Sequence, residues 1–138
     1  MVERRKKTQI TGNTGMFYVC YLLSKMGWNV MPTVRNAKGV DIIACNSDAT
    51  ETISIQVKTL STKTSVLLGS TLDKIIGDFW IIVNNIERKT PQTFIMKPNE
   101  VKERAHKGEG KNGKIIYWLP TKEYAEFQDR WDLIELAE

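Results

Sequence analysis

The chain has few of the residues from which common catalytic and structural sites are built. Among its 138 residues there is one histidine, His106, so the sequence argues against a zinc centre or a Ser-His-Asp triad. Its two cysteines, Cys20 and Cys45, lie in apolar segments. That setting is typical of buried free thiols rather than of a disulfide or a metal clip.

Long hydrophobic runs are also missing. No run approaches the roughly 20 apolar residues that a membrane-spanning helix needs. The basic N-terminus is not followed by the apolar segment of a signal peptide. We therefore expect no membrane partner and a cytoplasmic location.

Acidic residues are absent from one long segment. No Asp or Glu occurs between Arg4 and Val40, and this segment carries seven basic residues: Arg4, Arg5, Lys6, Lys7, Lys25, Arg35 and Lys38. A face with such a charge suits a polyanion, so we expect DNA contacts from Arg4, Arg5, Lys6, Lys7, Arg35 and Lys38. The alternative for residues 1–7 is a solvated basic tail.

The length and composition fit one domain over residues 1–138. Residues 1–10 are predicted to form a flexible basic tail. A helix is predicted from Thr11, Asn13 or Thr14 to Met26, with Gly27 ending it. Its buried stripe would comprise Met16, Val19, Cys20, Leu23 and Met26.

The remaining pattern predicts strands at residues 28–34, 40–46, 51–59, 79–83, 93–96 and 115–119. Residues 66–68 fit a short strand or a helical turn, and residues 71–76 fit one helical turn. Helices are expected after Pro98 and after Thr121, the latter with a core-covering aromatic stripe. The glycine-rich residues 107–114 are expected to be a flexible loop. The predicted fold class is α/β, with a mixed central sheet flanked by helices.

Three polar residues are predicted to converge at one end of a hairpin. Asp41 precedes an apolar strand, and Gln56 and Lys58 end the next strand along the chain. Because Gln56 and Lys58 are two residues apart, their side chains point to one face of that strand. Separately, Asp41 could be a turn-capping acid and Lys58 a solvated edge charge.

An acid on one strand, followed by (Asp/Glu/Gln)-x-Lys at the end of the next, resembles the PD-(D/E)XK nuclease superfamily. The chain is most similar there to small Holliday-junction-resolvase-like proteins, over roughly residues 8–100. The resemblance implies a restriction-endonuclease-like α-β-β-β-α-β core and hydrolysis of DNA. It implies Mg²⁺ or Mn²⁺ bound by Asp41, Gln56 and the Val57 carbonyl, with Asp41, Gln56 and Lys58 as catalytic residues.

Two positions depart from the family pattern. Met16 stands where members usually carry a glutamate on the opening helix, and Gln56 is neutral where an acid often stands. The sequence therefore leaves two functions open. One is a metal-dependent DNA endonuclease of low activity; the other is an inactive nuclease-fold protein that binds nucleic acid or a protein partner. Whether the chain forms a homodimer is also open.

Overall fold

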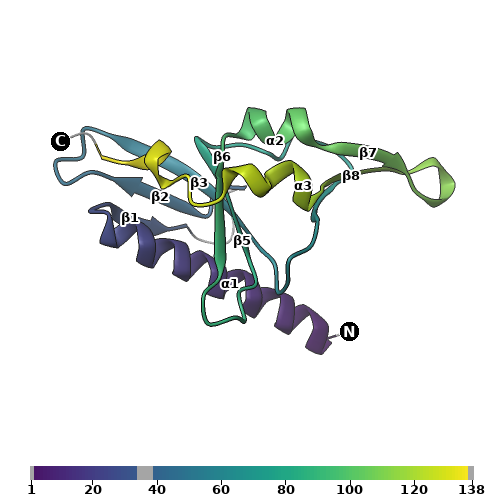
Figure 1. Cartoon of the computed structure of the whole chain (residues 1–138), viewed down its shortest axis with the longest axis horizontal. Helices are drawn as coiled ribbons and strands as arrows, with labels where there is room; N and C mark the ends of the chain where they lie inside the picture. Colours follow the sequence, from purple (N-terminus) through teal and green to yellow (C-terminus); the bar gives the residue numbers. More distant parts are fainter. Residues whose placement is uncertain (1, 34–38, 137–138) are drawn as a thin grey trace.

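A computed structural model describes the backbone of residues 2–33 and 39–136, and side chains from residue 7 onward within those ranges. The chain folds as an α/β protein, as predicted, with a mixed sheet and flanking helices (Figure 1). The helices are α1 (Val2–Lys25), α2 (Pro98–Arg104) and α3 (Thr121–Tyr124). The strands are β1 (Asn29–Pro32), β2 (Ile42–Cys45), β3 (Thr52–Thr59), β4 (Val66–Gly69), β5 (Phe79–Asn84), β6 (Gln92–Met96), β7 (His106–Glu109) and β8 (Ile115–Leu119).

Helix α1 begins earlier than the sequence pattern indicated. The prediction of a tail over residues 1–10 was wrong, because the backbone is helical from Val2. The segment before Thr11 is rich in Glu, Arg, Lys and Gln, which favour helix, and it contains no proline or glycine. The predicted end was correct, since Gly27 has φ +100° and its N–H donates to the Ser24 carbonyl at 3.0 Å.

The main sheet has five strands in the order β1-β2-β3-β5-β6. Strands β1, β2 and β3 form an antiparallel meander, β5 runs parallel to β3, and β6 is antiparallel to β5. Strand β1 is at the edge, as predicted from Pro32. Residues Trp80 to Asn84 are all buried, which confirms a strand covered on both faces.

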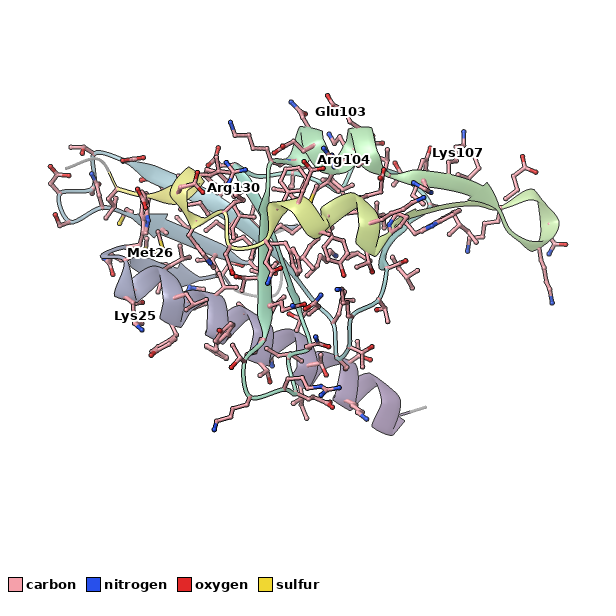
Figure 2. All side chains as sticks on the ribbon, viewed as in Figure 1. Lys25, Met26, Glu103, Arg104, Lys107 and Arg130 are labelled. Atoms are coloured by element: carbon pink, nitrogen blue, oxygen red, sulfur yellow. The ribbon has the colours of Figure 1, made fainter. Side chains whose placement is uncertain are left out.

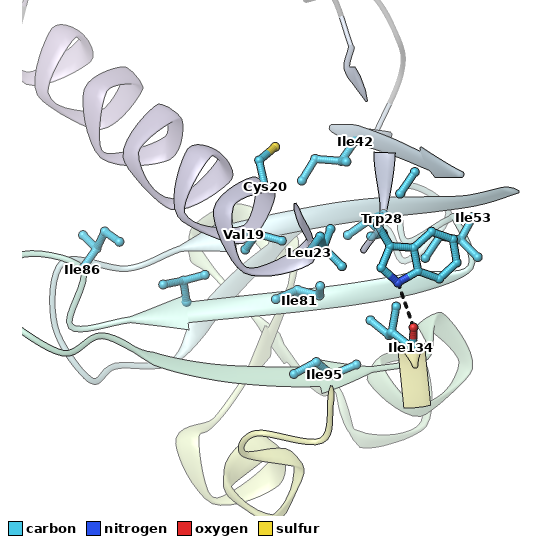
Figure 3. Packing of buried hydrophobic residues seen from close by; sticks show 13 residues of the cluster. Val19, Cys20, Leu23, Trp28, Ile42, Ile53, Ile81, Ile86, Ile95 and Ile134 are labelled. Carbon is cyan, nitrogen blue, oxygen red and sulfur yellow. Dashed lines mark hydrogen bonds between the residues drawn. The ribbon is translucent and has the colours of Figure 1, made fainter. Parts of the chain in front are cut away.

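The two faces of this sheet carry different layers. One face packs against α1, where Val19, Cys20 and Leu23 are buried and Met16 is partly buried, as the helical stripe predicted (Figure 3). On the other face, a second apolar cluster joins β5 and β6 to α2, α3 and the second sheet. Neither Cys20 nor Cys45 forms a disulfide, and both are buried, as expected.

The second sheet has three strands in the order β4-β8-β7 and was not predicted. The prediction of a flexible loop over residues 107–114 was wrong. Strands β7 and β8 pair antiparallel, with a turn at Lys111–Gly113, and project from the body (Figure 1). Figure 2 shows Lys107 on this hairpin, at the opposite end of the molecule from Lys25 and Met26 of α1.

The chain between β3 and β5 also differs from expectation. The core implied by the family resemblance has a helix here, and one helical turn was predicted at residues 71–76. Residues 60–78 instead contain β4, which is the strand alternative predicted for residues 66–68, and a turn in which the Ile75 N–H donates to the Leu72 carbonyl at 3.1 Å. Serine and threonine are frequent in residues 59–71, and they favour turns over helix.

The predicted C-terminal helix is three short pieces: α3, then 3-10 turns at Ala125–Phe127 and Trp131–Ile134. The break lies at Asp129, which has φ 55° and whose N–H donates to the Thr93 carbonyl at 2.9 Å. The aromatic stripe does cover the core, as expected, since Tyr124 and Phe127 are buried. Among the helices of the described chain, none has both the length and the apolar character needed to cross a membrane.

Candidate functional site

Asp41 is held between β1 and β3 by its own backbone. Its N–H donates to the Ile55 carbonyl at 2.9 Å, and its carbonyl accepts the Thr33 N–H at 2.9 Å. The side chain is fixed as well, because Oδ2 accepts the Val57 N–H at 2.7 Å. The Asp41 carboxylate therefore lies against the Gln-Val-Lys end of β3, where the hairpin pattern predicted it.

Gln56 points to the face of the sheet opposite α1. It is 6% exposed, and its Oε1 accepts the indole N–H of Trp80 at 2.6 Å. This contact follows from strand register, because Gln56 and Trp80 are partners in the parallel β3–β5 pair. A buried amide needs such a partner. One consequence is that the oxygen predicted to bind a metal already accepts a hydrogen bond.

Lys58 lies on the same face of β3 as Gln56, and its positive charge acts on Asp41. Burial raises the pKa of the Asp41 carboxyl above its ordinary value, while the Val57 N–H and the Lys58 charge oppose that rise. Desolvation thus outweighs both attractive contacts. Shifted carboxyl pKa values are common at functional sites, although structural carboxylates also show them.

A pocket of about 670 Å³ opens beside these residues. Gln56, Lys58 and Trp80 form its floor on the sheet, and Gly39 lies at its margin. The wall comes from the chain between β3 and β5, through Leu68, Asp73, Lys74, Ile75 and Ile76. Among the described residues the charged lining is Lys58, Lys74 and Asp73, which together carry a net positive charge.

Met16 does not belong to this pocket. Its side chain is partly buried and packs in the apolar cluster between α1 and the sheet. Neither Met16 nor Asp41 is among the residues that line this pocket, so the hypothesis that Met16 faces the same pocket as Asp41 finds no support here. Met16 lies in the core stripe of α1 because its spacing matches Val19, Cys20 and Leu23.

The predicted DNA-contacting residues are described only in part. Lys7 is exposed on α1. Arg4, Arg5 and Lys6 are on the helical backbone of α1, but their side chains lie outside the described residues. Arg35 and Lys38 also lie outside them.

The donor set fits a metal ion only in a limited way. Asp41 keeps one carboxylate oxygen beyond its bond to Val57, while the Gln56 oxygen accepts the Trp80 N–H. Among the side chains of residues 7–33 and 39–136, no three His, Cys, Asp or Glu form a group suited to a metal. Mg²⁺ can bind through one carboxylate together with waters and substrate phosphates. The residues therefore fit a cation shared with a phosphate, not a preformed protein cage.

The sequence pattern missed the three pocket residues, besides Gln56 and Lys58, whose side chains carry a charged or polar group. Asp73 and Lys74 lie in a segment without periodicity, so no local signal marked them. Trp80 was assigned only to a buried strand. A buried indole N–H needs an acceptor, and the polar Gln56 in a neighbouring strand was the available signal.

No protein-family model matches the chain, and neither a curated protein nor a solved structure is significantly similar to it. The likeness to PD-(D/E)XK nucleases stays a prediction from the Asp41 and Gln56-Val57-Lys58 pattern.

Proposed function

We propose that the protein binds DNA at the Asp41–Lys58 site and hydrolyses phosphodiester bonds there with the help of Mg²⁺ or Mn²⁺. One observation carries the proposal: the Asp41 carboxylate is fixed on the Val57 N–H, next to Lys58 and beside an open pocket of positive charge. The sequence order is also the one on which the nuclease resemblance rests. An acid stands on the first strand of a hairpin, and Gln-x-Lys ends the second.

Each residue has a distinct role in this proposal. The Lys58 ammonium binds a non-bridging phosphate oxygen and offsets the negative charge that grows during hydrolysis. Asp41 and the Val57 carbonyl would hold the divalent cation, whose chemistry is to activate a water and support the leaving oxygen. Gln56 positions this end of β3 through its bond to Trp80.

The predicted cation affinity depends on DNA. Asp41 is the one acid of the two proposed metal-binding groups, so the protein alone attracts a cation weakly. A bound phosphate adds negative charge at the same place. At about 4 Å and an effective dielectric near 20, one unit negative charge attracts a divalent cation by roughly 8 kcal/mol. We therefore expect cation and DNA to bind cooperatively.

A second function is favoured by two specific contacts. The Gln56 oxygen accepts the Trp80 N–H, and Met16 packs in the core instead of supplying a site residue. Both contacts suit a protein that binds the DNA phosphate without cleaving it. Lys58 would then remain the phosphate contact.

The test compares nicking of supercoiled plasmid with Mg²⁺ or Mn²⁺ by the wild type, Asp41→Asn and Lys58→Met. Lys63→Met is the matched control, because Lys63 is an exposed lysine on the segment after β3. We expect wild-type nicking, a loss of about a hundredfold in both site variants, and no change in the control. Melting temperatures confirm that each variant is folded.

Two outcomes contradict the hydrolysis proposal. Nicking that both site variants retain would mean that the activity is not at this site. If the wild type does not nick, but Lys58→Met weakens DNA binding and Lys63→Met does not, the non-cleaving function replaces it.

A further inference from the structure

A second, smaller pocket lies on the other side of the end of β3. Its volume is about 300 Å³, and it is lined by Lys7, Thr8, Thr11, Thr59, Leu60 and Ser61. Half of this lining comes from the first half of α1 and half from the end of β3 and the residues after it. Here Thr59 packs closely on Gly15 of α1.

The chemistry of this lining is that of an anion site. Lys7 supplies a positive charge, four residues supply hydroxyl groups, and among the residues whose side chains the structure describes no carboxylate lies in the lining. The Thr59 hydroxyl is shielded from solvent and has no hydrogen-bond partner among the described residues. An unpaired buried hydroxyl costs free energy and needs an explanation. A small shift of this side chain toward a bound phosphate oxygen would supply the missing partner.

The strand end that carries this lining is fixed in place. The Leu60 N–H donates to the Val83 carbonyl at 2.7 Å, and the Leu60 carbonyl accepts the Ile86 N–H at 3.2 Å. Lys58 and Thr59 are consecutive in β3, so their side chains point to opposite faces. Lys58 lines the larger pocket, and Thr59 lines the smaller one. The two pockets therefore flank one rigid strand end.

We propose that the smaller pocket is a second phosphate subsite, in which Lys7 and the Thr59 hydroxyl bind a backbone phosphate of the DNA whose scissile phosphate is at Lys58. The inference rests on the proposed function, because it extends the same DNA across the end of β3. It assigns to Lys7 a defined contact in place of a general basic charge.

The experiment measures affinity for a 20-base-pair DNA duplex across a salt series in full-length wild type, Lys7→Gln and Thr59→Val. The matched controls are Lys63→Gln and Thr62→Val, both at exposed positions shortly after the subsite. We expect Lys7→Gln to weaken binding severalfold and to reduce the salt slope by about one. Thr59→Val should weaken binding severalfold without changing that slope. Both controls should bind as wild type.

A purely structural role for Thr59 gives a different result. Replacing an unpaired buried hydroxyl by a methyl group would then raise the melting temperature and leave DNA affinity unchanged. That result, together with wild-type affinity in Lys7→Gln, would overturn the subsite.

Plasmid nicking by the same variants separates this inference from the proposed function. Nicking that requires Lys58, with DNA affinity independent of Lys7 and Thr59, rejects the subsite alone. DNA affinity that depends on Lys7 and Thr59 without any nicking supports the subsite and rejects hydrolysis. Absence of DNA binding by the wild type rejects both.

Discussion

The two faces of the main sheet are built from the same strands but carry different side chains. Toward α1, strands β3 and β5 present Ile53, Ile55, Ile81 and Val83, all buried in one apolar cluster. Toward the other side, the intervening positions present Gln56, Lys58 and Trp80. Alternation along two strands therefore gives a packing face toward α1. The opposite face, called the chemical face below, carries a second apolar cluster together with the residues of the proposed site.

Each face of the sheet also contains a tryptophan whose indole N–H donates a hydrogen bond. On the α1 side, the indole N–H of Trp28 donates to the Ile134 carbonyl at 2.9 Å and ties the C-terminal segment to the core (Figure 3). On the other side, the indole N–H of Trp80 donates to Gln56, a residue of the proposed site. Trp28 thus links the C-terminal segment to the core, and Trp80 holds the side chain of Gln56.

The largest effect is expected from a substitution that disrupts the packing face. A Cβ at Gly15 would overlap the Thr59 side chain, where α1 packs against β3. Gly15→Ala should therefore destabilise the protein by about 3 kcal/mol or more, measured by urea unfolding. Gly12→Ala is the control, since a Cβ there meets no atom within 4 Å. It should stabilise the helix by up to about 1 kcal/mol.

A second substitution tests whether the overlap with Thr59 causes this loss of stability. Thr59→Ala removes most of the side chain that a Cβ at Gly15 would meet, so it should recover part of the stability lost in Gly15→Ala. A double variant no more stable than Gly15→Ala alone would place the cost elsewhere.

A smaller effect is expected on the chemical face. Trp80→Phe leaves the buried Gln56 oxygen without its donor, at a cost of about 1–3 kcal/mol plus the cost of the smaller ring. Adding Gln56→Leu removes the unpaired group, so the double variant should regain stability relative to Trp80→Phe. Trp28→Phe is the matched control on the α1 side. All three are compared by urea unfolding and by DNA affinity.

The Trp28→Phe and Trp80→Phe substitutions should differ in their effect on DNA affinity. Trp28→Phe should lower stability while the folded protein keeps its DNA affinity, because Trp28 packs in the cluster under α1 and does not line the pocket. Trp80→Phe should lower both. Equal DNA affinity in the two folded variants would argue against a positioning role for Trp80.

The packing face could be predicted from sequence because its signals are local. The stripe of α1 repeats at helical spacing, and the β2–β3 hairpin has alternating apolar residues around a polar turn. Asp41, Gln56 and Lys58 could be placed at one end for the same reason. Their contacts could not, since the Gln56–Trp80 bond depends on a parallel pairing between residues 24 positions apart.

The second sheet was missed because its signals are misleading. Gly108 and Gly110 suggest a flexible loop, yet both lie beside larger side chains of β8. A Cβ at Gly108 would be 3.0 Å from the Trp118 ring, and one at Gly110 would be 2.8 Å from Ile116. These glycines make room for side chains that lie across the hairpin. Sequence alone does not distinguish this use of glycine from a loop.

The smallest expected effect concerns the charge of Asp41. Because burial raises its pKa in the folded state, the folded protein binds this proton more tightly than the unfolded chain does. The associated stability is fully present below the unfolded pKa of about 3.9 and is lost as pH rises through the folded value. Asp41→Asn has no charge to bury, and its side-chain oxygen can still accept the Val57 N–H. We therefore expect this variant to melt above wild type at neutral pH, with the difference shrinking toward zero as the pH falls below about 4.

Asp48 provides the control of opposite sign. Hydrogen bonds from the Thr50 hydroxyl and backbone N–H lower the pKa of this carboxyl, which lies in the exposed β2–β3 turn. Its stabilising effect is present above the unfolded pKa and is lost as pH falls through the folded one. Asp48→Asn should therefore melt slightly below wild type at neutral pH and converge with it in acid. If both variants shifted in the same direction with pH, burial of the Asp41 charge would not be the cause. Opposite shifts would mean that burial of the Asp41 carboxylate against the end of β3 lowers the stability of the folded protein.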